Sequence, residues 1–287
     1  MKLFIEQLLN GLATGSIYAI ITLGLALVYG VMRILHVAHA AVFTVGAYLG
    51  VAVFHATGSL ALAFLASMAA CALLGVLIER AVYFPLLRFP PYVPLIASIA
   101  VMLTLEELCR LLAGPQILTF EARLPLPSLD LGGVHLSSTL LAVYLFTAVI
   151  LALLWYLSNR TEFGLAMRAT SQDMAIASAQ GIDSHRVISL TFVIGSAIAA
   201  VGGILVGIYY NQVYPTMGAV PAYKTLALIV VGGMGSVSGA VIAALLLGLA
   251  ETLLIGYLNV PFPRDALAFV AMIAVLVWRS EGLLGSR

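Results

Sequence analysis

Long apolar runs separated by short polar segments dominate the chain, and this pattern predicts helices that cross a membrane. A membrane span requires about 20 largely apolar residues, and eight blocks approach or exceed that length. They cover residues 8–31, 36–55, 59–79, 94–113, 138–157, 187–209, 224–256 and 265–279. We therefore expect an all-α, polytopic membrane helical bundle of about eight transmembrane segments, with no sheet and with one domain over residues 1–287.

Composition supports a membrane protein. The chain is 63% hydrophobic and 9% charged, whereas soluble domains carry about 25% charged residues, and its mean hydropathy is +1.13. The 13 lysines and arginines are scattered and the net charge is +1, so no basic face for nucleic acid is expected. The first apolar run continues to about Val31, which favours an uncleaved first helix over a signal peptide.

Alternation of the spans places residues 32–35, 80–93 and 158–186 on one side of the membrane. Basic residues concentrate in cytoplasmic loops, so this side is predicted to be cytoplasmic. The arginines concerned are Arg33, Arg80, Arg88, Arg160, Arg168 and Arg186. The side of the C-terminus stays open, because block 224–256 is too long for one ordinary span and short for two.

Residues 231–240 read VGGMGSVSGA and fall within this long block. The run has no lysine and its flanks are apolar, which excludes a phosphate-binding loop. Glycines favour irregular backbone, and such backbone at membrane depth must be buried in protein or line a watery cavity. We expect a broken helix beside a translocation pathway, with a tight turn between two short helices at the membrane surface as the alternative. The pathway residues concerned are Gly232, Gly233, Gly235 and Ser236.

The longest polar stretch, residues 158–186, predicts a short amphipathic helix outside the membrane. Thr161 suits its N-cap, and Gly181 suits the position after its C-terminus. This helix is interpreted either as a surface helix at the lipid interface or as a docking helix that fits a groove on a cytoplasmic partner. The candidate contact residues are Arg168, Asp173, Ala175, Gly181, Ile182 and Asp183.

Ionisable groups within membrane spans are candidates for function, because their insertion is costly. Glu251 either pairs with an arginine of another helix or faces the pathway. His36 and His39 lie three residues apart on one helix face; without a third ligand nearby a metal site is disfavoured, and polar contacts at the mouth or floor of the pathway are favoured. Glu106 and Arg110 lie four residues apart and predict an ion pair near a membrane boundary.

Small residues recur every four positions in two of the blocks. Such stripes let two helix backbones approach closely, and the sequence leaves open whether the neighbouring helix belongs to this chain or to a partner. The stripes are Gly195, Ala199, Gly203 and Gly207, and then Ala240, Ala244 and Gly248.

Six segments in order resemble the branched-chain amino acid ABC transporter permease family, of the type with two different permease subunits. Within the polar stretch, AIASAQGID (175–183) resembles the loop through which ABC importer permeases contact their ATPase. The family usually has Asn-Phe-Ala-His-Gly where this chain has HVAHA (36–40). The six segments are NGLATGSIYAIITLGLALVYG (10–30), HVAHAAVFTVGAYLG (36–50), ERAVYFPLLR (79–88), AQGIDSHRVISLTFVIGSAIAAVGG (179–203), VGGMGSVSGA (231–240) and WRSEGLLG (278–285).

The resemblance implies a permease subunit of an ABC importer in the bacterial inner membrane. Its implied cargo is branched-chain or other aliphatic amino acids, with urea and short amides carried by close relatives. Its implied partners are a second homologous permease subunit, two cytoplasmic ATP-binding subunits and an extracytoplasmic substrate-binding protein. The chain has no Walker sequence, so no cofactor is expected in it and ATP is expected to be hydrolysed by the partner subunits.

An autonomous secondary carrier or channel is the alternative function. The polar stretch argues against it, because a stand-alone carrier does not need a docking helix. A membrane-embedded enzyme is not supported, since the motifs of metalloproteases and serine hydrolases are missing from the sequence.

Overall fold

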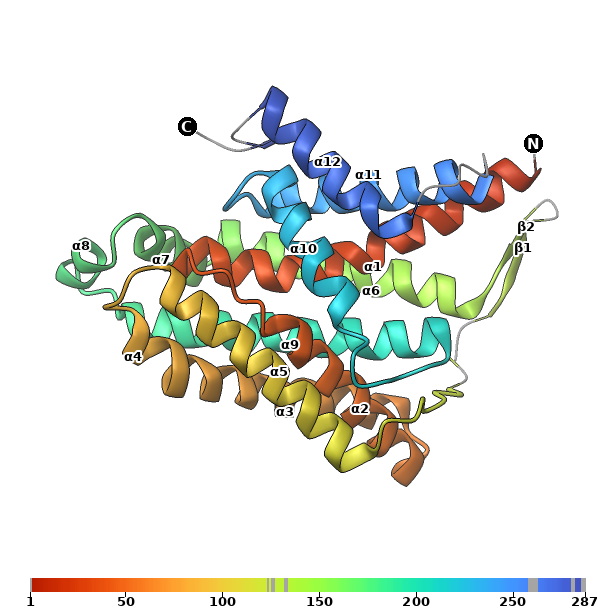
Figure 1. Cartoon of the computed structure of the whole chain (residues 1–287), viewed down its shortest axis with the longest axis horizontal. Coiled ribbons are helices and arrows are strands. Elements are labelled where there is room, and N and C mark those ends of the chain that lie inside the picture. Colours follow the sequence, from red (N-terminus) through yellow and green to blue (C-terminus); the bar gives the residue numbers. More distant parts are fainter. Residues whose placement is uncertain are drawn as a thin grey trace.

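All eight apolar blocks fold as helices in the computed structural model, which describes residues 2–122, 124, 127–131, 134–257, 263–279 and 282–284. Block 224–256 forms two helices, and each of the other seven forms one (Figure 1). Within the described residues, six helical segments are long and apolar enough to cross a membrane. The long helices are α1 (Lys2–Met32), α2 (His39–Thr57), α3 (Leu60–Ile78), α5 (Tyr92–Ala113), α6 (Ser138–Arg160), α9 (Ser184–Tyr210), α10 (Ala219–Gly232), α11 (Val237–Glu251) and α12 (Arg264–Trp278).

Shorter elements lie in the connections. The polar loop between α5 and α6 contains two antiparallel strands of three residues each, β1 (Leu129–Leu131) and β2 (Val134–Leu136). The expectation of no sheet was therefore wrong for this loop, although the bundle itself is all-α. The remaining short elements are the π-helices η1 (Glu79–Tyr83) and η2 (Thr252–Tyr257), and the helices α4 (Phe84–Leu86), α7 (Glu162–Gln172) and α8 (Met174–Ala179).

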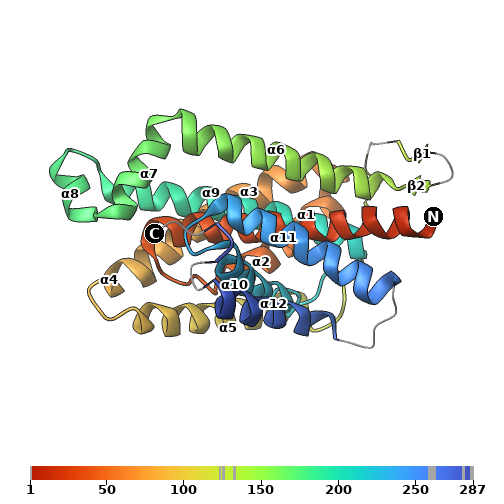
Figure 2. The ribbon, with the colours of Figure 1, turned by 90° about the horizontal axis from the view of Figure 1, so that it is seen from above.

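The long helices run between two ends of the bundle, here called the α8 end and the β-hairpin end (Figures 1 and 2). The ends of α1 and α3, with α4, α7 and α8, gather at the α8 end. The grouping of residues 32–35, 80–93 and 158–186 on one side is thus confirmed. Helix α10 runs toward the α8 end, α11 returns from it and α12 runs toward it again, so the last helix also ends on this side.

Helices α1 and α9 form the centre of the bundle, and the stripes of small residues explain how they are packed. A side chain on Gly203 of α9 would collide with the backbone carbonyl of Phe43 in α2. Gly248 of α11 lies against the backbone of Gly15 in α1 in the same way. Both stripes therefore pack against helices of this chain, since only a residue without a Cβ permits such close approach.

Helix α2 begins inside the bundle rather than at its surface. After Met32 the chain turns back through residues 33–38, and the ring of His39 lies against Gly24 of α1. Gly24 precedes the end of α1 by eight residues, which is about 12 Å along the helix axis. The backbone N–H of Ala38 is satisfied there by the hydroxyl of Ser98, at 2.9 Å.

Helix α10 also begins inside the bundle, reached from the opposite end. Gly218, directly before it, is buried against the carbonyl of Ala40 at the start of α2. Ala40 lies 17 residues before the end of α2, so this contact is about 25 Å from the β-hairpin end of that helix. With 14 residues, α10 is about 21 Å long, less than the roughly 30 Å core of a bilayer. Two helix starts thus meet within the bundle.

Candidate functional site

The polar stretch 158–186 projects from the α8 end as two helices instead of one (Figure 2). Thr161 caps α7 as predicted, since its hydroxyl accepts from the N–H of Gly164 at 3.2 Å. The expectation of a continuous helix was wrong at Asp173, which has extended backbone and ends α7. Its carboxylate accepts from the N–H groups of Ala175 and Ile176 at 2.8 and 2.9 Å, and so starts α8.

Gly181 ends α8 as the sequence predicts. Its φ of +87° lies in the left-handed region, where glycine has no steric penalty. The N–H of Ile182 bonds to the carbonyl of Ala177 at 3.1 Å, and the N–H of Gly181 bonds to that of Ser178 at 3.0 Å. These two bonds form a Schellman motif, which turns the chain sharply toward α9.

The start of α9 anchors this turn. Asp183 caps α9 through the N–H of Arg186 at 3.1 Å and also pairs with its guanidinium at 2.8 Å. Ser184 is buried and contacts the hydroxyl of Ser178 at 3.1 Å, which ties α8 to α9. Arg168 donates to the carbonyl of Ser158 and thereby ties α7 to α6.

The outer face of α8 remains open. Ile176 is 63% exposed, and Asp173, Ala175 and Gly181 are exposed beside it. Three of the candidate contact residues, Asp173, Ala175 and Gly181, therefore lie exposed on the same short helix and its ends as the apolar side chain of Ile176.

The glycine run is a tight turn at the α8 end, so the expected broken helix at membrane depth was wrong and the alternative is supported. Gly233 and Gly235 have φ values of +106° and +93°, and the side chain between them, Met234, is 53% exposed. Ser236 caps α11 through the N–H of Gly239 at 3.1 Å. Gly232 packs directly against the backbone of Gly239, so its role is close packing.

The C-terminal segment closes over this turn. The N–H groups of Leu283 and Leu284 bond to the carbonyls of Val231 and Gly232 at 2.8 and 3.0 Å. These carbonyls belong to the last turn of α10, and the carbonyl groups of a last turn have no hydrogen-bond partners within their own helix. The end of α10 is thus satisfied by backbone from beyond α12.

Replacing Gly235 by Ala is expected to lower stability by about 1–2 kcal/mol, because the left-handed backbone is unfavourable for a residue with a Cβ. A Cβ at this position would meet no atom within 4 Å, so the effect is conformational alone. Gly30→Ala is the matched control, since Gly30 lies in α1 with equally open surroundings. Thermal unfolding of both variants in detergent tests the turn; equal midpoints would contradict it.

His36 and His39 lie inside the protein, at the buried start of α2. Nδ1 of His36 is 2.6 Å from the hydroxyl of Tyr83, and Phe192 of α9 packs on the same ring. Within the described residues, Nε2 of His36 and both ring nitrogens of His39 have no hydrogen-bond partner. The two rings therefore do not line an open mouth or floor of a pathway in this conformation. The described residues contain no group of three His, Cys, Asp or Glu side chains that could hold a metal ion.

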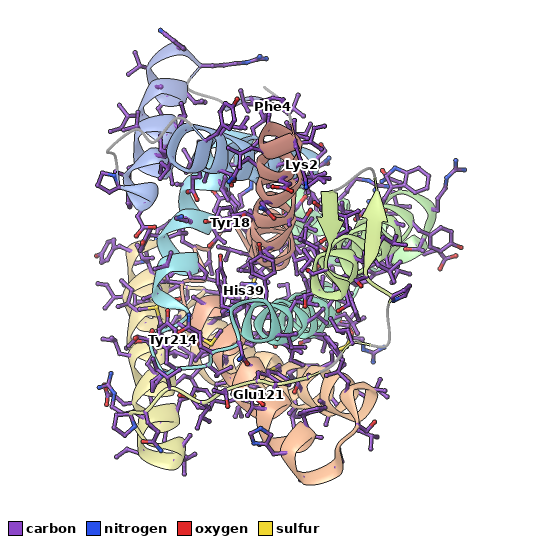
Figure 3. All side chains as sticks on the ribbon, turned by 90° about the vertical axis from the view of Figure 1, so that its right-hand side faces the viewer. Lys2, Phe4, Tyr18, His39, Glu121 and Tyr214 are labelled. Carbon is purple, nitrogen blue, oxygen red and sulfur yellow. The ribbon has the colours of Figure 1, made fainter. Side chains whose placement is uncertain are left out.

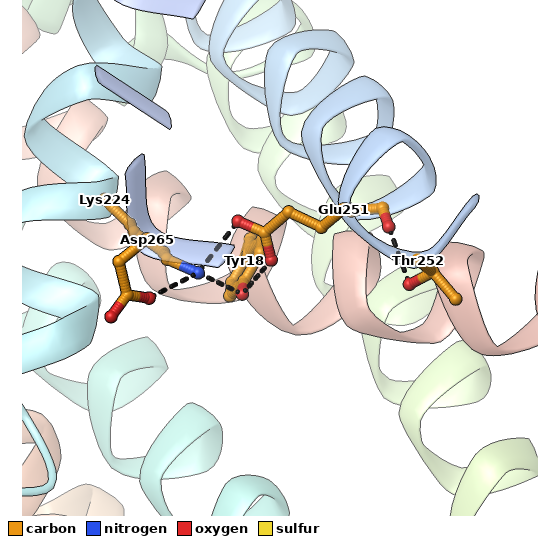
Figure 4. Close-up of polar contacts among 6 residues, drawn as sticks. Tyr18, Lys224, Glu251, Thr252 and Asp265 are labelled. Atoms are coloured by element: carbon orange, nitrogen blue, oxygen red, sulfur yellow. Dashed lines mark hydrogen bonds and ion pairs between the residues drawn. The ribbon is translucent and has the colours of Figure 1, made fainter. Parts of the chain in front are cut away.

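Glu251 belongs to a buried ion-pair cluster that joins four helices (Figure 4). Its partner is Lys224 of α10, at 2.8 Å, and both side chains are almost fully buried. The hydroxyl of Tyr18 in α1 donates to Glu251 at 2.8 Å and accepts from Lys224 at 2.8 Å. Asp265 of α12, 51% exposed, contacts Lys224 at 3.2 Å. Glu251 is thus paired, with a lysine instead of an arginine.

Three members of this cluster were not proposed from the sequence. Lys224 lies in the apolar stretch YKTLALIV, and the rule that singled out Glu251 applies to it equally. Tyr18 and Asp265 carry no comparable signal. Arg110 also differs from expectation: it pairs with Glu107 at 2.6 Å, while Glu106 is buried.

Comparison with known proteins now identifies the family. Residues 7–276 match the model of a family described as the permease component of the branched-chain amino acid transport system. The chain belongs to this family. It is 32% identical to the high-affinity branched-chain amino acid transport system permease protein BraD of Pseudomonas aeruginosa, over 98% of this chain and 96% of that protein. The corresponding protein LivH of Escherichia coli is also 32% identical, with the same coverage.

More distant matches agree with membership of this permease family. A probable branched-chain amino acid transport permease, LivH of Methanocaldococcus jannaschii, is 29% identical over 51% of this chain and 48% of its own length. Among solved structures, PsaBC from Streptococcus pneumoniae in complex with Fab matches with a TM-score of 0.51 and 14% identity, covering 94% of this chain and 89% of that one. The structural likeness supports the helical membrane fold.

Proposed function

We propose that this chain is a permease subunit of an ABC importer that carries branched-chain or other aliphatic amino acids. The family match over residues 7–276 carries this proposal. An aliphatic cargo suits a pathway built from apolar helices, and the relatives from Pseudomonas aeruginosa and Escherichia coli are named as branched-chain amino acid permeases. The chain would supply the pathway and no chemistry of its own.

The α8 end is the proposed cytoplasmic side, in the bacterial inner membrane. Helix α8 offers what a docking element requires: an exposed apolar residue, Ile176, on a short helix held by Asp173 and Gly181. Because both ends of α8 are capped, a movement of the docked ATPase would displace α9 rather than deform α8. ATP would be bound and hydrolysed by two partner subunits at this surface.

The pathway is proposed to border the starts of α2 and α10. Discontinuous helices that begin at membrane depth are a common way to build a transport pathway. His36 and His39 lie at the start of α2, and Glu251 pairs with Lys224 in the second turn of α10. A second homologous permease subunit would complete the pathway, and an extracytoplasmic binding protein would deliver the cargo to the β-hairpin end.

Co-purification and uptake test this function together. The tagged chain, expressed with its candidate partners, should retain an ATP-hydrolysing subunit through detergent extraction. Proteoliposomes of the complex should take up leucine only with ATP and binding protein, and competition with valine, isoleucine, urea and short amides defines the cargo. Uptake of leucine by the chain without ATPase subunits would instead identify a secondary carrier.

A further inference from the structure

A cavity opens at the β-hairpin end between α5 and the connection from α9 to α10. It has a volume of about 430 Å³, within the range of small-molecule sites. Figure 3 looks at this end, with Tyr214 between α5 and the start of α10. The lining residues are Arg110, Pro115, Ile117, Gln212, Tyr214, Pro215 and Thr216.

One positive side chain lines this cavity, and a helix N-terminus follows its lining residues in the sequence. Arg110 is the charged residue in its lining, and its guanidinium is a fork of donors that matches a carboxylate. The second feature is the start of α10: Thr216 lines the cavity and lies three residues before Ala219, the first residue of the helix. A helix N-terminus carries a partial positive charge, and the first two residues of α10, Ala219 and Val220, are exposed although Gly218 before them is buried.

Neutral polar groups complete the lining. Gln212 and Thr216 offer side-chain donors, and Tyr214 offers a hydroxyl, while Ile117 and two prolines supply apolar surface. A cation, neutral polar groups and an apolar wall in one small cavity suit a molecule with a carboxylate and an aliphatic side chain.

We infer that this cavity is the first binding site for the amino acid on the permease, and that Arg110 binds its carboxylate. The inference rests on the proposed function and adds a residue and a place to it. Thr216 lines the cavity, and the next two residues, Met217 and Gly218, are buried directly before α10, so a carboxylate held there would lie at the entrance to the proposed pathway.

Glu107 provides a test of this site, because its carboxylate competes with the ligand for Arg110. It occupies one nitrogen of Arg110 at 2.6 Å, and both side chains are about half exposed. Exposed pairs contribute little stability, so an incoming carboxylate can replace or share this contact. Removing the charge of Glu107 should strengthen binding in the cavity, whereas removing the charge of Arg110 should abolish it.

Protection of an introduced cysteine measures this binding. Ile117→Cys places a thiol at the exposed rim, in a chain whose free cysteines, Cys71 and Cys109, are replaced by Ala. The complete transporter is reconstituted in proteoliposomes and labelled from outside with an impermeant thiol reagent. We expect leucine and 4-methylpentanoate, which share a carboxylate, to slow labelling at least threefold, and 3-methylbutylamine, which lacks one, to have no effect.

Variants then assign the effect to Arg110. In the same reporter chain, Arg110→Gln should remove protection, Arg110→Lys should retain part of it, and Glu107→Gln should lower the leucine concentration needed for half protection. Equal protection by the amine, or unchanged protection in Arg110→Gln, would overturn the inference. Protection by the binding protein alone, without free leucine, would also overturn it and assign the cavity to that partner.

Uptake by the same proteoliposomes distinguishes failure of this binding site from failure of the proposed function. Leucine uptake without cavity protection would reject only this site. No uptake of any amino acid by a complex that hydrolyses ATP would reject the proposed function instead.

Discussion

Lys224→Met is expected to lower the stability of the folded chain by about 3–5 kcal/mol, the usual effect of removing one partner from a buried ion pair. Glu251 would remain as a buried carboxylate and, within the described residues, would keep the hydroxyl of Tyr18 as its donor. The yield of monodisperse protein in detergent and its thermal unfolding midpoint measure the effect. Glu251→Gln should be milder, because Lys224 keeps its contact with Asp265.

The double variant Lys224→Met with Glu251→Leu is the control for this prediction. Replacing a whole buried pair by apolar residues of similar volume is often neutral or stabilising, and Asp265 is half exposed and stays hydrated. The double variant should therefore recover most of the lost stability. If it unfolds as readily as Lys224→Met, lost packing rather than an unpaired charge explains the defect.

Gly181→Val is expected to reduce uptake and substrate-stimulated ATP hydrolysis at least tenfold while the chain still inserts. Valine is strongly disfavoured at a φ of +87°, so the Schellman turn and the orientation of α8 should be lost. The defect should lie in coupling, because Gly181 is exposed and a Cβ there would meet no atom within 4 Å. Uptake and ATP hydrolysis are measured on one preparation.

Gly58→Val supplies the matched control. Gly58 also ends a helix with positive φ, at +67°, and has open surroundings, but it lies between α2 and α3 at the opposite end of the bundle. Both variants carry similar backbone strain, so only the Gly181 variant should lose coupling. Equal loss in both would show that strain, and not the ATPase contact, limits uptake.

The helices were predictable because their signal is local. Each span is a run of apolar residues long enough to cross the hydrocarbon core of a membrane. Each helix cap uses a residue type with a known backbone preference, such as Thr161 or Gly181. The α8 surface was predicted for the same reason. Asp173 was missed as a boundary because an aspartate inside a helix and an aspartate that caps one look alike without the fold.

The breaks at membrane depth were not predictable in the same way. The glycines of residues 231–240 predicted a break at membrane depth, yet they form a turn at the α8 end. The irregular segment that enters the bundle is residues 33–38, which contains no glycine. Its inner residues His36 and Ala38 are buried and are held by Ser98, Tyr83 and Phe192 from three other elements. Partners so distant in sequence, like the pairing of Glu251 with Lys224, follow from the tertiary fold alone.

The buried start of α2 also implies a delay during biosynthesis between its insertion and its burial. Its irregular backbone cannot face lipid, and one of the side chains that covers His36 is Phe192, made 156 residues later. At the 5–20 residues per second of protein synthesis, that delay is about 8–30 s. During this interval the segment must be in contact with the insertion machinery rather than with lipid, until α9 is synthesised and packs against it.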